Sequence, residues 1–172
     1  MSTFSPERQV RRSLGTVALV ACVAIGGATQ KAFAHCEIPC GIYGDRMRSQ
    51  ELREHFTTIE KSMKTVTELS QAKGQKNFNQ IVRWVNNKEL HANKVQEIVY
   101  QYFMNQRIKP TKEGEDGYEE YVEQLTLLHH MLVSAMKCKQ TTDLQHVNDL
   151  QEALDAFDKA YFQDPEHDPH TH

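Results

Sequence analysis

Apolar side chains recur at steps of three and four residues along most of the chain after residue 45, which is the spacing of one face of an α-helix. The first stripe follows Asp45, a residue suited to cap a helix, and runs to about Ser70. Gly74 interrupts the pattern, and a second stripe begins near Asn77, another capping residue, and ends before Pro110. These two expected helices carry Leu52, Phe56, Ile59, Met63, Val66 and Leu69, then Phe78, Ile81, Val82, Val85, Ala92, Val95, Val99, Tyr102 and Phe103.

Two further stripes complete the pattern. A loop containing Gly117 precedes the third, and Thr142 or Asp143 is placed to cap the fourth, which ends at Asp164-Pro165. The third expected helix carries Tyr118, Tyr121, Val122, Leu125, Leu128, Leu132 and Ala135, and the fourth carries Leu144, Val147, Leu150, Leu154, Phe157 and Tyr161. Four amphipathic helices with short connections predict an all-α protein, an antiparallel four-helix bundle over residues 45–163.

One turn of the second helix breaks its stripe. Asn86, Asn87, Lys88 and Glu89 stand where apolar residues are expected. Either this turn faces solvent, or its polar groups meet the N-terminal segment or a neighbouring subunit. Because a bundle of this size buries a modest core against a large loss of chain entropy, association into a homo-oligomer would stabilise it.

The segment before the helices has the pattern of a secretory signal peptide. Arg8, Arg11 and Arg12 form a positive start, residues 14–28 form an apolar run, and Ala32-Phe33-Ala34 has the A-x-A form of a cleavage site. A retained membrane anchor is the alternative. We therefore expect residues 1–34 to be removed and the protein to be exported, to a periplasmic or other extracytoplasmic location. The paired arginines loosely resemble a twin-arginine signal, which leaves the export route open.

Composition narrows the possible partners. The formal net charge is −3 and the pI is near 6.3, which argues against nucleic acid as a partner. Mean hydropathy is −0.64, so no membrane association is expected after processing. The last residues, 164–172, include His167, His170 and His172 and are expected to form a disordered tail. That tail is either simply solvated or a means of capturing metal.

Cleavage after Ala34 would make His35 the first residue and would place an unusual set of ligands within six residues. His35 offers its α-amine and its imidazole, Cys36 offers a thiolate and a backbone amide, and Cys40 offers a second thiolate. The small chelate rings formed by adjacent donors favour a plane, and tetragonal nitrogen and sulfur ligation suits Ni(II) or Cu(II). Residues 35–44 are therefore predicted to be a metal-binding hook that precedes the bundle.

Two other interpretations of the cysteine pair remain. In an exported protein, two close cysteines form a disulfide by default. A tetrahedral zinc site is also possible if a histidine elsewhere supplies a fourth ligand. Of the other two cysteines, Cys22 would leave with the signal peptide and Cys138 is expected to be a structural thiol.

The sequence His35-Cys36-Glu37-Ile38-Pro39-Cys40-Gly41-Ile42-Tyr43 resembles the nickel-binding hook of the nickel superoxide dismutase family, and the helical remainder agrees with that family's four-helix bundle. The resemblance implies one nickel ion per subunit, held by His35, Cys36 and Cys40. It places Tyr43 beside the open face of the metal, where we assign it to gating and ordering water. It places Glu51 where it would orient the axial imidazole, and it implies a homohexamer.

The sequence departs from the family pattern in three ways. The acidic residue after the first cysteine is often Asp in the family, and here it is Glu37. Some members pair the glutamate equivalent to Glu51 with an arginine of the second helix, where this chain has Asn87; Asn87, Lys88 and Glu89 are the candidates to replace it. Many relatives have a cytoplasmic leader removed by a dedicated protease, whereas this chain has an export signal.

The reaction that the resemblance implies is the disproportionation of superoxide to dioxygen and hydrogen peroxide through a Ni(II)/Ni(III) cycle, with two protons supplied. Lysines near the site, Lys88 among them, are candidates for steering the anion. The alternatives are an exported helical protein that binds or delivers metal without catalysis, and a structural protein with a Cys36–Cys40 disulfide.

Overall fold

The structure is a computed structural model that describes residues 44–71 and 74–162. The predicted signal peptide, the hook and the histidine-containing tail lie outside these residues. The described chain forms α2 (Asp45–Ser70), α3 (Gln75–Glu97), the π-helix η1 (Ile98–Arg107) that continues α3, α4 (Tyr118–Gln140) and α5 (Gln145–Tyr161). No strand occurs in these ranges, and the predicted all-α class is confirmed.

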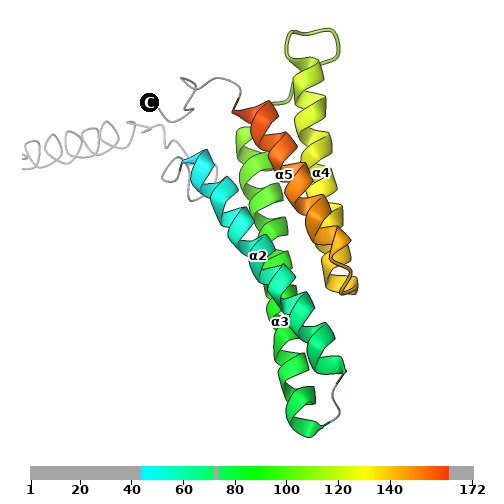
Figure 1. The fold of residues 1–172 in the computed structure, drawn as a ribbon. Helices are drawn as coiled ribbons and strands as arrows, with labels where there is room; N and C mark the ends of the chain where they lie inside the picture. Colours follow the sequence, from blue (N-terminus) through cyan, green and yellow to red (C-terminus); the bar gives the residue numbers. More distant parts are fainter. Residues whose placement is uncertain (1–43, 72–73, 163–172) are drawn as a thin grey trace, which may run out of the picture. The chain divides into compact units, whose positions relative to one another are not determined.

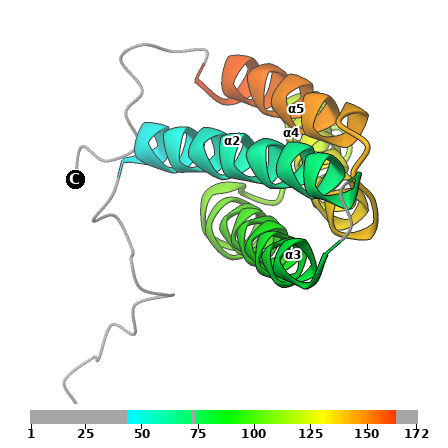
Figure 2. The same cartoon turned by 60° about the horizontal axis from the view of Figure 1, so that its bottom comes forward.

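Successive helices run in opposite directions and close into a bundle. Each of α2 and α4 packs against both α3 and α5, so every helix has two neighbours. Figure 1 shows this up-and-down order, and Figure 2 views the same packing from below. None of the helices in the described ranges is both long and apolar enough to cross a membrane.

The predicted stripes form the core, although three of their residues are exposed: Phe78, Val82 and Val122, the last at 41% on α4. The core is aromatic near the end of the bundle where α2 begins: the ring of Phe103 meets those of Phe157 and Tyr161 at centroid distances of 5.0 and 5.8 Å. Phe78 and Val82, expected to be buried, are 69% and 43% exposed. They lie near the start of α3, in the part of the α2–α3 hairpin that extends past α4 and α5, so only α2 is available to cover them (Figure 1).

The helix starts differ in detail from those predicted. α2 has Gly44 in the N-cap position, and Asp45 is its first helical residue, so the prediction that Asp45 caps the helix was wrong. Its carboxylate is instead turned into the bundle. The second helix starts at Gln75 rather than near Asn77, after Gly74 at φ 148°, a conformation that favours glycine. Leu144 is the N-cap residue of α5, while the Asp143 carboxylate accepts the Gln145 N–H at 3.0 Å.

The last part of the second helix is a π-helix, which the sequence analysis did not predict. It ends with a hydrogen bond from the Ile108 N–H to the Phe103 carbonyl, a step of five residues, at 3.0 Å. In an α-helix, residues five apart point in directions that differ by about 140°. In a π-helix, whose hydrogen bonds span five residues, such residues lie nearly on the same side of the helix. Tyr102 and Arg107 are five apart, and both reach Asp45 at the start of α2.

The polar turn of the second helix contains a buried lysine. Lys88 is 3% exposed, and its ammonium donates to the carbonyls of Cys138, Lys139 and Thr141 at 2.6, 2.6 and 3.1 Å. An ammonium has three donors, and these three carbonyls at the end of α4 use them all. The predictions that this turn is wholly solvated and that Lys88 steers an anion were therefore wrong for Lys88.

Lys88 should contribute strongly to stability. We expect Lys88→Met to lower the free energy of unfolding by about 1.5–3 kcal/mol, because charged hydrogen bonds to buried helix-end carbonyls would be lost. Urea unfolding followed by circular dichroism measures this change. Lys76→Met is the matched control, since Lys76 is exposed in the first turn of α3 and its replacement should have little effect. An equal change in both variants would contradict the role given to Lys88.

Candidate metal site and its supporting residues

The predicted metal ligands His35, Cys36 and Cys40 lie outside the described residues, as do Glu37 and Tyr43. Their assignment therefore remains a prediction, supported by the chemistry of the donors: an amine, an imidazole, an amide and two thiolates suit nickel. Within residues 44–71 and 74–162, no three His, Cys, Asp or Glu side chains are grouped so as to hold a metal ion. What the structure does describe is the end of the bundle where the chain leaves the hook.

That end is organised around the buried carboxylate of Asp45. The Tyr102 hydroxyl donates to its Oδ1 at 2.5 Å, and the Tyr161 hydroxyl donates to its Oδ2 at 2.8 Å. The guanidinium of Arg107 donates to Oδ2 at 2.9 Å and lies 2.9 Å from Oδ1. These partners come from η1 and α5, so one residue of α2 joins three elements. Because Asp45 follows Gly44 directly, this cluster fixes the point at which the chain enters the bundle.

The electrostatics of the cluster follow from these contacts. Burial by itself would raise the pKa of Asp45, but hydrogen bonds from Tyr102, Arg107 and Tyr161 together with the charge of Arg107 lower it. Burial and the hydrogen bonds to Asp45 raise the pKa of both tyrosines. Asp45 is therefore ionised near neutral pH, and the tyrosines remain protonated donors.

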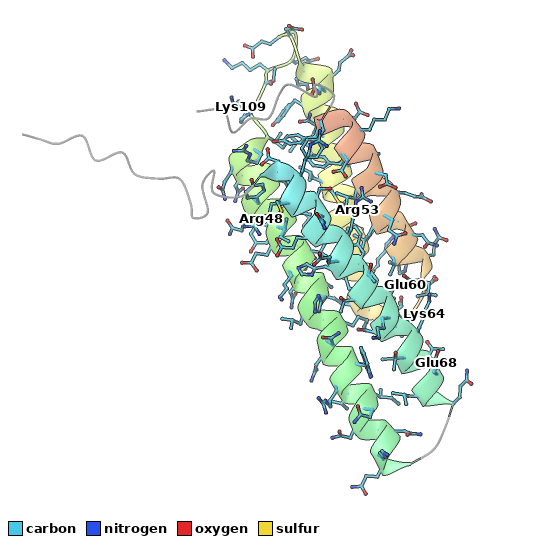
Figure 3. All side chains as sticks on the ribbon, turned by 60° about the vertical axis from the view of Figure 1, so that its left-hand side comes forward. Arg48, Arg53, Glu60, Lys64, Glu68 and Lys109 are labelled. Atoms are coloured by element: carbon cyan, nitrogen blue, oxygen red, sulfur yellow. The ribbon has the colours of Figure 1, made fainter. Side chains whose placement is uncertain are left out.

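Glu51 lies in the second turn of α2, with its side chain 40% exposed. Its Oε2 accepts a hydrogen bond from Arg48 at 2.6 Å, and Arg48 in turn lies over the ring of Tyr102, 5.2 Å from its centroid. Figure 3 shows Arg48 near the start of α2, and Arg53 one turn farther on, where it pairs with Asp155 and Asp158 of α5. A groove of about 490 Å³ runs beside Met47, Arg48, Gln50, Glu51 and Glu54.

In the structure, the partner of Glu51 is none of the three candidates that the sequence analysis named. None of these residues pairs with Glu51 in the described contacts: Asn87 donates to the Ser62 hydroxyl at 3.1 Å, and Lys88 with its neighbour Glu89 lies by the end of α4. Arg48 takes that place from the same helix. The spacing of Arg48 and Glu51, three residues apart, is the signal that would have identified the pair.

A histidine pair lies one turn beyond Glu51. His55 of α2 and His91 of α3 face each other with their Nδ1 atoms 3.1 Å apart and their rings nearly perpendicular. The sequence analysis did not single out this pair. The spacing of Glu51 and His55, four residues apart on one helix face, was a signal for half of it, but the approach of His91 depends on how α2 and α3 pack.

Comparison with known families settles which protein family this architecture represents. A family model described as nickel-containing superoxide dismutase matches residues 30–164, which include the predicted hook and the whole bundle. The chain belongs to this family. It is therefore a superoxide dismutase of the nickel-containing type, an oxidoreductase, as the sequence predicted.

No curated protein and no solved structure matched the chain significantly. The family match nevertheless covers residues 35–44, the predicted hook. It agrees with the all-helical architecture of the described residues.

Proposed function

We propose that this protein removes superoxide outside the cytoplasm, with one nickel ion per subunit held by the N-terminus of the processed chain. His35 would supply its amine and imidazole, Cys36 its thiolate and amide nitrogen, and Cys40 a second thiolate. The observation that carries this proposal is that the family match includes these residues, which directly follow the Ala32-Phe33-Ala34 cleavage pattern. Subunits would assemble into a homo-oligomer, a hexamer as the family resemblance implies.

When bound, nickel would supply a one-electron Ni(II)/Ni(III) couple, which allows superoxide to be oxidised in one half-reaction and reduced in the other. The residues of the chain would supply the ligands and hold them in position. Thiolates and a deprotonated amide are electron-rich donors that suit the higher oxidation state, and Glu51 would orient the His35 imidazole. Tyr43 would order water beside the metal, while Glu37 would take the place of the family's more usual aspartate.

The bundle supports this proposal through the start of α2. Asp45 is tied to η1 and α5, so the residue next to Gly44 is held in one position relative to Glu51, two turns along the same helix. A rigid helix that carries both the attachment point and the orienting carboxylate would favour a reproducible distance between them. The Arg48 ion pair further restricts the Glu51 side chain.

The test is to block the terminal amine without changing any side chain. A precursor with one glycine inserted between Ala34 and His35 should yield a chain with little nickel and no superoxide turnover, because the amine is displaced from its chelate ring. Metal analysis, terminal sequencing and direct kinetics of superoxide decay measure this.

Glu37→Asp is the matched control for the insertion, since it alters the hook but leaves His35 first, and it should retain nickel and activity. A mature chain that begins at another residue and turns over superoxide at full rate would overturn the amine ligand. Nickel binding without turnover in the parent protein would instead favour a metal-delivery role.

A further inference from the structure

The α2–α3 hairpin is longer than the rest of the bundle. Lys88 of α3 binds the carbonyls at the end of α4, and Asn87 beside it donates to Ser62 of α2. These contacts mark the level at which α4 ends. Residues 64–71 and 74–86 lie beyond that level, where α2 and α3 continue without α4 and α5 (Figure 1). We call these residues the overhang.

The overhang presents apolar side chains that two helices cannot enclose. Phe78 is 69% exposed and Val82 is 43% exposed. Five further apolar residues of the overhang are only half-buried, and none of them belongs to the buried core of the described residues: Val66, Leu69, Ile81, Trp84 and Val85. An exposed apolar patch with a polar rim is typical of an interaction surface.

The rim of this patch is basic. Within residues 64–71 and 74–86 the cations are Lys64, Lys76 and Arg83, all exposed, and the one acidic residue is Glu68. Figure 3 shows Lys64 and Glu68 on the last turns of α2. Lys64 already pairs with Glu60 at 2.5 Å. Lys76 and Arg83 are therefore the cations best placed to meet a partner, and the partner should be acidic.

The opposite end of the bundle has the complementary character. Residues 113–123, which form the loop before α4 and its first turns, contain six carboxylates and no Lys or Arg. All six line a hollow of about 820 Å³, which we call the acidic hollow. Tyr118 also lines it, and Val122 in the same turns of α4 is 41% exposed. The hollow thus offers apolar groups among negative charges.

The overhang and the acidic hollow cannot meet within one molecule. The hollow lies at the start of α4, and the overhang extends past its end (Figure 1). α4 has 23 residues, so it separates the two surfaces by about 35 Å at 1.5 Å per residue. Contact between two overhangs would bring like charges together, whereas contact between an overhang and a hollow brings opposite charges together.

We propose that the overhang of one subunit docks in the acidic hollow of a second copy of this chain, head to tail. Phe78 would pack against the partner's Tyr118 and Val122, and Lys76 and Arg83 would face the partner's carboxylates. Because the two sides of this contact differ, it repeats from copy to copy and closes into a ring if the rotation allows. The inference rests on the homo-oligomer proposed above, but it does not depend on nickel.

The test uses the difference between the two sides of the contact. The overhang variant combines Phe78→Ser with Arg83→Glu, and the hollow variant combines Glu113→Lys with Glu123→Lys. All four residues are exposed, so the helical fold should persist in circular dichroism. In sedimentation velocity of the nickel-loaded proteins, each variant alone should form a smaller species than the parent. Glu97→Lys, exposed on α3 outside both surfaces, is the control and should sediment as the parent does.

Mixing the two variants is the decisive step. An equimolar mixture should form a species larger than either variant alone, because the overhang variant keeps its hollow and the hollow variant keeps its overhang. A mixture that does not associate would overturn the proposal. So would parent-like assembly of both variants, or a loss of assembly confined to the overhang variant, which would place the overhang against another surface.

A second measurement leaves the sequence unchanged. A carbodiimide joins an amine directly to a carboxylate with which it forms an ion pair. In the assembled parent, mass spectrometry should find Lys76 joined to carboxylates of residues 113–123, which are too distant within one molecule. Absence of these links from the assembled parent would overturn the contact.

The contact and the proposed activity can fail separately. A parent that assembles through these surfaces but does not turn over superoxide would contradict the proposed function and leave the contact in place. A monomeric parent that turns over superoxide would contradict the assembly and the contact, but not the activity.

Discussion

Replacing Cys36 with serine should remove nickel and superoxide turnover together. A serine hydroxyl stays protonated near neutral pH and is a poor ligand for a soft divalent metal, so it cannot substitute for a thiolate. We expect nickel to fall to background and turnover to fall below detection, and Cys40→Ser should behave in the same way. Metal analysis and pulse radiolysis of the purified variants measure both quantities.

Cys138→Ser provides the matched control for the cysteine experiment. Cys138 is fully buried in α4, and burial raises the pKa of its thiol to about 12, so it remains a neutral core side chain. Its replacement should lower stability and leave nickel content and turnover unchanged. Retention of nickel by Cys36→Ser would contradict the ligand assignment. A metal-free parent in which Cys36 and Cys40 resist alkylation until reduced would favour the disulfide instead.

Asp45→Ala should have the largest effect on stability. The substitution leaves the guanidinium of Arg107 and the hydroxyls of Tyr102 and Tyr161 half-buried without their shared acceptor. Removing one partner of a buried charge pair costs about 3–5 kcal/mol, and we expect a loss of that order in the free energy of unfolding by urea. Asp116→Ala, in the exposed loop before α4, is the control and should change it by less than about 0.5 kcal/mol.

The stability of the parent should also depend on the protonation of Asp45. Its pKa is lower in the folded chain than its ordinary value of 3.8, so protonation favours unfolding. The stabilisation is complete above that ordinary value and is lost as the pH falls through the lower pKa of the folded state. Asp45→Ala should show a weaker dependence on acid than the parent, and an unchanged dependence would contradict the cluster.

The sequence predicted the helices well because their apolar stripes pack as the periodicity requires. Leu52, Phe56, Ile59 and Met63 are all fully buried on α2. Phe78 was misplaced because periodicity indicates which face is apolar but not how far a neighbouring helix extends. The π-helix was missed because the residue types in Ile98–Arg107 carry no pattern that distinguishes its wider turn from that of an α-helix.

Polar residues were harder to predict than apolar ones. Asp45 was expected to cap a helix, and Lys88 was given a solvated position or a steering role, because both types are usually exposed. Their real partners lie 50 or more residues away in the sequence, which no local pattern encodes. The donors of the hook, in contrast, are contiguous from His35 to Cys40, so a short motif sufficed to predict them.

The bond between Asp45 and Tyr161 joins the first residue of the first described helix to the last residue of the final one, 116 positions apart. Contacts of such long range form late, because the entropy of closing the intervening loop must be overcome first. During synthesis Tyr102 and Arg107 can bind Asp45 first, but the last of its three partners is missing until the final helix has emerged. A chain shortened before Tyr161 would be impaired at the opposite terminus, where the hook joins the bundle.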